Sequence, residues 1–156
     1  MIQFFVEKTK FSLTGKSVLK KWIEKILNER SMECGEINII FVPDSYILRL
    51  NKKSLGHNFY TDIITFDYSV DQLVNGDLYI SAETVFANAA EYKQTFEKEI
   101  CRVIIHGILH MIGEDDITPA LQKKMRVAEN SALKKLSVNT IKCKLTVGNK
   151  QNKNGR

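Results

Sequence analysis

The pattern of hydrophobic and polar residues along the chain divides it into segments of strand type and helix type. Short runs of β-branched and aromatic residues predict strands, at residues 2–7, 36–42, 61–68 and 77–81. Apolar residues at helical spacing predict helices, at residues 17–30, 45–51, 81–92, 96–112 and 119–136. We therefore expect an α+β fold with a small mixed sheet of about four strands and about five helices. The sequence does not determine the strand order.

Polar residues at the segment boundaries predict where helices and turns begin. Thr14 or Ser17 can cap the first helix, and Asp44, Ser81, Thr95 and Thr118-Pro119 can open the later ones. Residues 52–60 are interpreted as a loop. Asn75-Gly76 predicts a hairpin turn, which leads into residues 77–81 as the last strand.

The segment 96–112 is apolar on nearly all sides, which is typical of a buried central helix. His106 and His110 interrupt it four residues apart, so both imidazoles can point at one place. Gly113 can end the helix, and the carboxylates of residues 114–116 can fold back toward the same place. Two imidazoles and one carboxylate form a metal site with an open position, as in catalytic zinc sites. Nickel or iron would accept the same ligands.

Gly107 argues against one class of metalloenzyme. In the HExxH signature of zinc peptidases, this position holds the glutamate that acts as general base. The glutamate is absent here, so a metallopeptidase is disfavoured. Gly107 would instead allow another backbone or a substrate to approach the helix closely.

The net charge of +5 comes from the end of the chain. Residues 134–156 contain seven lysines and arginines and no acid, whereas residues 1–133 carry 16 basic and 18 acidic side chains. The positive charge therefore does not predict a basic nucleic-acid surface on the folded part. We expect one domain over residues 1–136 and a basic polar tail over 137–156. The tail contains a possible short extended piece at 140–147 and should be disordered at its end.

Cysteine usage and hydropathy favour a cytoplasmic protein. Cys34, Cys101 and Cys143 are widely spaced and form no CxxC pair, which does not suggest a disulfide framework. The N-terminus has no basic stretch typical of a signal peptide, and no apolar run is long enough to span a membrane. We expect no membrane partner.

Four stretches in order give the chain a specific resemblance. Residues 106–116 (HGILHMIGEDD) resemble the HGxLHLxGxDH signature of the YbeY family, bacterial endoribonucleases of rRNA maturation. Residues 36–42 with Leu50-Asn51, residues 61–66 (TDIITF) and residues 76–81 (GDLYIS) resemble three further family motifs. Met125 and Glu129 also occupy family positions. The resemblance implies a zincin-like fold around a metal-bearing helix, with His106 and His110 as zinc ligands.

The chain departs from the family pattern at two positions. Asp116 replaces the third ligand, a histidine in the family, and can still bind zinc. Leu55 replaces an arginine that would contact substrate phosphate, a charge that Lys52, Lys53 or His57 could supply without its bidentate geometry. His57 is either a phosphate contact or proton carrier, and hence a catalytic candidate, or an exposed loop histidine.

The resemblance and the spacing assign roles to the neighbours of the ligands. Asp115 is either a residue that orients a ligand or part of a solvated turn, and Glu114 is interpreted as a surface residue. By resemblance, Thr61 and Asp62 line the substrate cleft. Lys52 and Lys53 are added to the cleft as candidates to supply the missing positive charge.

These residues support two hypotheses of different classes. The first is a metal-dependent endoribonuclease selective for single strands. The family resemblance implies its substrates, rRNA and ribosomal particles, and its role in rRNA maturation and ribosome quality control, with no DNA substrate expected. The second is a ribosome-assembly binding factor with a structural metal and weak or no nuclease activity, which the changes at Leu55 and Asp116 motivate. A metallopeptidase is the third and least favoured hypothesis, because Gly107 stands where the HExxH signature has its glutamate.

Overall fold

The computed structural model describes residues 1–55 and 61–146, except for the side chains of residues 54 and 55. Its main sheet has four strands in the order β1-β3-β5-β4. The strands are β1 (Ile2–Val6), β3 (Glu33–Val42), β5 (Leu73–Ser81) and β4 (Ile63–Asp67). The pairs β1–β3 and β3–β5 are parallel and β4–β5 is antiparallel, so the predicted mixed sheet is confirmed.

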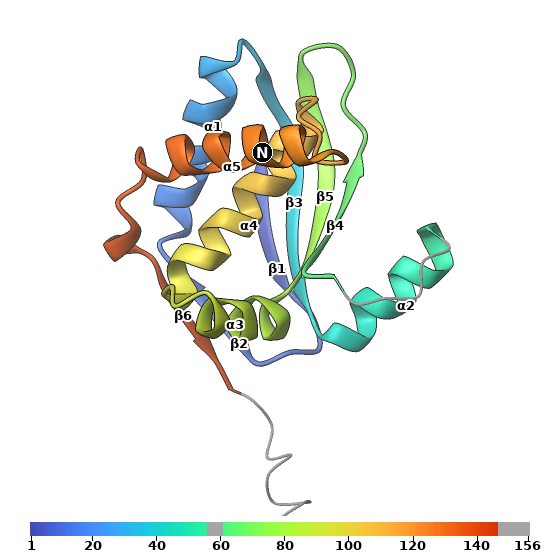
Figure 1. The fold of residues 1–156 in the computed structure, drawn as a ribbon, viewed down its shortest axis with the longest axis vertical. Coiled ribbons are helices and arrows are strands. Elements are labelled where there is room, and N and C mark those ends of the chain that lie inside the picture. Colours follow the sequence, from blue (N-terminus) through green and yellow to red (C-terminus); the bar gives the residue numbers. More distant parts are fainter. Residues whose placement is uncertain (56–60, 147–156) are drawn as a thin grey trace, which may run out of the picture.

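Five α-helices surround this sheet, as predicted. They are α1 (Lys16–Glu29), α2 (Asp44–Leu55), α3 (Ala82–Glu91), α4 (Phe96–Met111) and α5 (Pro119–Leu133). Figure 1 shows α1, α3, α4 and α5 on one side of the sheet and α2 on the other. Each side has its own apolar core, because alternate residues of β3 point in opposite directions. Ile39 and Phe41 belong to the larger core, and Ile40 and Val42 to the smaller core beneath α2.

The helix α4 is central, as its composition predicted. It packs against β4, β5, α3 and α5, and its apolar residues from Ile100 to Met111 are buried. The Thr95 side chain caps its first turn by accepting a hydrogen bond from the Lys98 N–H, and Gly113 has a φ of 98° just beyond its end. Both predicted ends of this helix are therefore confirmed. Within residues 1–55 and 61–146, no helix combines the length and the apolar character needed to cross a membrane.

The predicted turn at Asn75-Gly76 is wrong. Both residues lie inside β5, and the chain turns earlier, around Asp71, which has a φ of 53°. Gly76 is needed for close packing instead. A Cβ atom at residue 76 would lie 2.4 Å from the Phe66 carbonyl oxygen and 2.9 Å from Met111 Sδ. A glycine at this position therefore lets the end of α4 approach the sheet closely.

The segment 77–81, which we predicted as the last strand, is followed by one more strand. Strand β2 (Phe11–Thr14) pairs antiparallel with β6 (Lys142–Leu145), which follows a short 3₁₀ helix, η1 (Val138–Thr140). Ile141 is fully buried in the larger core, so ordered packing continues past residue 136, where we expected the tail to begin. The expected extended piece at 140–147 corresponds to β6. The predicted disorder at the end of the tail concerns residues 147–156, which lie outside the described residues.

Two helix starts or ends also differ from the sequence prediction. Neither Thr14 nor Ser17 caps α1: Gly15 occupies the N-cap position with a φ of 87° and no side-chain hydrogen bond, and Thr14 belongs to β2. Helix α2 continues to Leu55, so residues 52–55 are helical rather than part of a loop.

Candidate metal centre

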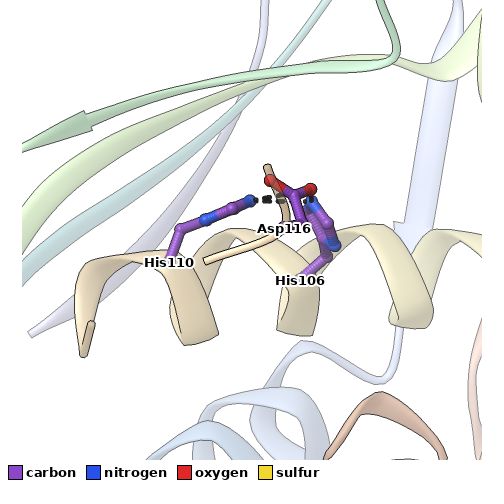
Figure 2. Close-up of side chains that lie close together, drawn as sticks. All are labelled: His106, His110 and Asp116. Atoms are coloured by element: carbon purple, nitrogen blue, oxygen red, sulfur yellow. Dashed lines mark hydrogen bonds and ion pairs between the residues drawn. The ribbon is translucent and has the colours of Figure 1, made fainter. Parts of the chain in front are cut away.

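His106, His110 and Asp116 are brought together at one end of α4. The two histidines come from adjacent turns of the helix, and Asp116 comes from the loop between α4 and α5 that folds back over them (Figure 2). The His106 and His110 Nε2 atoms are 3.0 Å apart, and Asp116 Oδ2 lies 3.5 Å and 3.4 Å from them. No other group of three or more histidine, cysteine or acidic side chains within the described ranges has a comparable arrangement.

The second ring nitrogen of each histidine has its own partner. His110 Nδ1 donates to the Glu114 carbonyl oxygen at 3.0 Å, and His106 Nδ1 lies 2.7 Å from Glu129 Oε2. A carbonyl oxygen can only accept, so His110 Nδ1 must carry the hydrogen, and a Glu129 carboxylate requires the same of His106. In the neutral rings, both Nε2 lone pairs therefore face one another and the Asp116 carboxylate. A cation between them would offset this repulsion.

The spacing of these three atoms fits a metal ion. Ligand atoms bound about 2.0–2.2 Å from a tetrahedral zinc ion lie about 3.3–3.6 Å from one another. Two of the three distances fall in this range, and the third, at 3.0 Å, is slightly below it. The donor set of two imidazoles and one carboxylate also suits zinc. Three protein ligands leave a fourth position for water or substrate.

Glu129, from α5, connects the centre to a buried ion-pair chain. Its Oε1 lies 3.2 Å from Arg102 Nη1, and Arg102 Nε lies 3.5 Å from Glu99 Oε1. Burial alone would lower the pKa of His106, but the hydrogen bond and charge of Glu129, with Asp116 and Asp62, raise it overall. Burial would raise the pKa of Glu129, but the same hydrogen bond and the nearby positive charges outweigh it and lower that pKa. The surroundings of His106 therefore favour positive charge at its ring.

The sequence did not reveal this role of Glu129. The sequence did contain a signal for it, an acidic residue on an apolar helical face. Glu129 follows Met125 by one helical turn, and these two residues are buried together with Ala132 and Leu133. An acidic residue on a buried helical face requires a partner. The partner could not be identified from the sequence, because it lies on another helix.

The loop after α4 is fixed by the residues between the ligands. The Glu114 side chain is mostly buried, and pairs with Arg30 at 3.0 Å, just after α1, and with Lys124 of α5 at 3.8 Å. The interpretation of Glu114 as a surface residue is therefore wrong, since it ties the loop to two helical segments while its carbonyl orients His110. Asp115 is exposed, and its Oδ1 accepts a hydrogen bond from the Asp116 N–H at 2.7 Å.

Two cavities meet at the metal centre, and both are bordered by Asp62, Ile63, His106 and Asp116. The α5-side cavity, of about 340 Å³, is also lined by Tyr92, Arg102, Gln122, Met125, Arg126 and Glu129. The β4-side cavity, of about 560 Å³, is also lined by Asn51, Thr61, Ile64, Thr65, Asp67 and His110. The centre is therefore open on two sides.

Of the cleft residues predicted from the sequence, some line the two cavities and others do not. Thr61 and Asp62 line the β4-side cavity, and Asp62 also borders the α5-side cavity. Lys52 and Lys53 are exposed on the last turn of α2 and line neither cavity. Asn51, which precedes them, is buried and does line the β4-side cavity. His57 lies outside the described residues.

Asp62 has the electrostatic character of a group that can exchange a proton. Burial raises the pKa of its carboxyl group. The nearby His106 ring and hydrogen bonds from the Asp62 and Ile63 N–H groups and Thr61 oppose this effect but do not cancel it. A carboxyl group with a raised pKa, beside a candidate metal centre, is a candidate general acid or base.

Gly107 allows close packing of α4 on the sheet. A Cβ atom at this position would lie 2.6 Å from Leu78 Cδ2 and 2.8 Å from Ile63 Cδ1. The groups that approach Gly107 are thus side chains of β5 and β4, rather than another backbone or a substrate as we expected. The position has no room for the glutamate of a peptidase.

Comparisons with known proteins identify the family of the chain. The sequence profile of the family described as Endoribonuclease YbeY matches residues 3–137. The chain is 41% identical over 138 residues to Endoribonuclease YbeY of Phocaeicola vulgatus, in a match that covers 88% of this chain and 100% of the relative. The chain belongs to the YbeY family of endoribonucleases. The predicted resemblance and the predicted enzyme class are thereby confirmed at the level of the family.

Further relatives cover most of the chain. Endoribonuclease YbeY of Bacteroides fragilis is 44% identical over 113 residues, which cover 72% of this chain and 81% of the relative. The solution structure of a Thermotoga maritima protein matches with a TM-score of 0.60 and 30% identity, over 86% of this chain and 87% of that one. The sheet and helices described above thus have the fold of this solved structure.

Proposed function

We propose that this YbeY-family protein is a zinc-dependent endoribonuclease that cleaves single-stranded rRNA, free or in ribosomal particles, in the cytoplasm. One observation carries the proposal: three metal-ligand atoms converge at a point between two open cavities. An endonuclease needs this arrangement, because its substrate continues on both sides of the bond that is cut. A blind pocket would admit only a chain end.

The residues of the chain have separate roles in this proposal. His106, His110 and Asp116 hold the metal, and Glu129 and the Glu114 carbonyl fix the orientation of the two imidazoles. A bound zinc ion supplies Lewis-acid stabilisation of charge on a phosphoryl oxygen. Nickel or iron would serve with the same ligands.

Asp62 is the residue that we assign to proton transfer. It is the acidic side chain, other than the ligand Asp116, that borders both cavities among the described residues. The environment that raises its pKa suits a group that takes a proton and returns it. In this assignment, Asp62 replaces the glutamate of the HExxH signature, for which Gly107 leaves no space.

The alternative, a binding factor with a structural metal, predicts that metal removal unfolds part of the chain. Two observations favour the enzyme. The core around α4 is fully buried without contribution from the ligands, and the side chains of His106, His110 and Asp116 are 25%, 28% and 36% exposed. A partly exposed site beside an already complete core is accessible to substrate, and the core does not depend on it for its packing.

Cleavage of a single-stranded rRNA fragment tests the proposal. The wild type should cut it with many turnovers and leave the same sequence uncut as a duplex or as DNA. His110→Ala and a chelated sample should lose this activity while they remain folded by circular dichroism, whereas Glu91→Ala, an exposed change on α3, should keep it. Equal cleavage by wild type, His110→Ala and the chelated sample would refute the proposal.

A further inference from the structure

Both cavities beside the candidate metal centre are lined by carboxylates, but they differ in their basic side chains. Among the described residues that line them, the lysine and arginine side chains are Arg102 and Arg126, and both belong to the α5-side cavity. A nucleic-acid strand brings one phosphate per nucleotide, and arginine pairs with phosphate in bidentate geometry. The α5-side cavity is thus the better place for a phosphate next to the one that is cut.

The two arginines are not equally available. Arg102 is largely buried, with its Nη1 2.9 Å from Asn130 Oδ1 and 3.2 Å from Glu129 Oε1. Arg126 lies one helical turn before Asn130 and its side chain is 60% exposed. Its Nη1 is 3.7 Å from Glu129 Oε1, a longer contact than that of Arg102. Arg102 is therefore part of the buried network, whereas Arg126 can turn to a phosphate while Glu129 keeps Arg102 and His106 as partners.

An aromatic ring borders the same cavity. Tyr92 follows the last residue of α3 and is 59% exposed, although it is large and mostly apolar. It reaches the cavity from a different element than Arg126, which is on α5. Stacking of a base on an exposed aromatic ring contributes substantially to single-strand binding and tolerates different sequences. A base can stack on such a ring only when it is unpaired, which fits a single-stranded substrate.

We propose that the α5-side cavity is the subsite for the nucleotide adjacent to the scissile phosphate, with its phosphate on Arg126 and its base on Tyr92. This assignment rests on the proposed endoribonuclease function and adds the residues that select an unpaired strand. The nucleotide on the other side of the cut lies toward the β4-side cavity.

Binding of a single-stranded 2′-O-methyl oligoribonucleotide, checked for integrity after each measurement, tests the subsite in the full chain. Fluorescence anisotropy over a range of salt concentrations should show weaker binding by Arg126→Gln, with a slope of log K against log salt reduced by about 0.7. Lys123→Gln is the matched control, because it removes an equal charge from an exposed position on α5 that lines neither cavity. Its slope should equal that of the wild type.

Tyr92→Leu should weaken binding of the oligoribonucleotide by at least about fivefold. This is the smallest effect expected from the loss of one stacking interaction between a base and an aromatic ring. Tyr68→Leu is the matched control, since Tyr68 is 60% exposed and lines neither cavity. Equal binding by the two tyrosine variants, or equal slopes for Arg126→Gln and Lys123→Gln, would overturn the subsite. A wild type that does not bind the oligoribonucleotide would also overturn it.

Cleavage by the wild type, measured in parallel, separates this inference from the proposed function. If the wild type cuts single-stranded RNA and both pairs of variants bind alike, the subsite is refuted and the endoribonuclease stands. If the wild type binds with the expected variant effects but does not cut, the subsite stands as a binding site and the proposed function is refuted.

Discussion

The Glu129 carboxylate lies 2.7 Å from His106 Nδ1, although 23 residues separate the two along the chain. Helix α5 thus determines the tautomer and the orientation of a residue on α4. The same carboxylate pairs with Arg102 Nη1 through its other oxygen at 3.2 Å, so a second contact holds it beside the imidazole.

Substitution Glu129→Gln tests this relationship. The amide keeps the size of the side chain but loses the charge that favours a cation at His106, so metal affinity should fall by about 10- to 100-fold. Competition with a chromophoric chelator measures this affinity. Glu91→Gln, an exposed change of the same chemistry, should leave it unchanged. Equal affinities of Glu129→Gln and wild type would show that Glu129 does not support the ligand.

Gly107→Ala tests the close packing of α4 on the sheet. The new Cβ would lie 2.6 Å from Leu78 Cδ2 and 2.8 Å from Ile63 Cδ1, and Leu78 is fully buried, so these side chains must shift within a packed core. We expect a decrease of about 1–3 kcal/mol in the free energy of unfolding, measured by urea denaturation. Gly113→Ala should also lower the free energy of unfolding, by about 1–2 kcal/mol, but for a different reason. No atom lies within 4 Å of its Cβ position, so the cost comes from the φ of 98°, which a residue with a side chain rarely adopts. Wild-type stability of Gly107→Ala would contradict the packing.

Burial of Asp62 predicts a pH-dependent effect on stability. Burial in the folded state raises the pKa of this carboxyl group above its ordinary value, so folding favours the protonated form. The resulting contribution to stability is present below the unfolded pKa and is lost as pH rises through the folded pKa. Metal-free Asp62→Asn, which cannot ionise, should therefore gain stability relative to metal-free wild type as pH rises from about 4 to 7. A difference that stays constant with pH would contradict the assignment.

The same substitution tests proton transfer. Asp62→Asn should lower kcat by about 100-fold or more, the usual contribution of a general acid or base, while its metal content stays that of the wild type. Thr65→Ser, a small change in the wall of the β4-side cavity, is the control for altered shape. Unchanged kcat in Asp62→Asn would exclude Asp62 as the proton-transfer residue.

The parts of the fold that depend on local signals could be predicted from the sequence. Helix α4 carries its own markers, with Thr95 at its start, Gly113 after its end and an apolar surface between them. The pairing of His106 with His110 follows from helical geometry alone. These local signals are sufficient to predict that the two imidazoles of the candidate metal centre lie together at the end of α4.

The parts that depend on distant contacts could not be predicted. Strand β2 has four residues, and its partner β6 lies near the other end of the chain, so neither segment signals the pairing. Asn75-Gly76 has the composition of a turn, but pairing with β3 and β4 and the approach of Met111 keep Gly76 in a strand. Glu114 and Glu129 acquire their roles only when separate helices come together. Tertiary packing overrode local preference in each case.

The metal content of the purified protein is the most direct test of the central claim that His106, His110 and Asp116 hold a metal ion. Elemental analysis should find about one zinc ion per chain in the wild type and in Glu91→Ala, and much less in Asp116→Ala. A wild type without transition metal, or Asp116→Ala with wild-type metal content, would contradict the account.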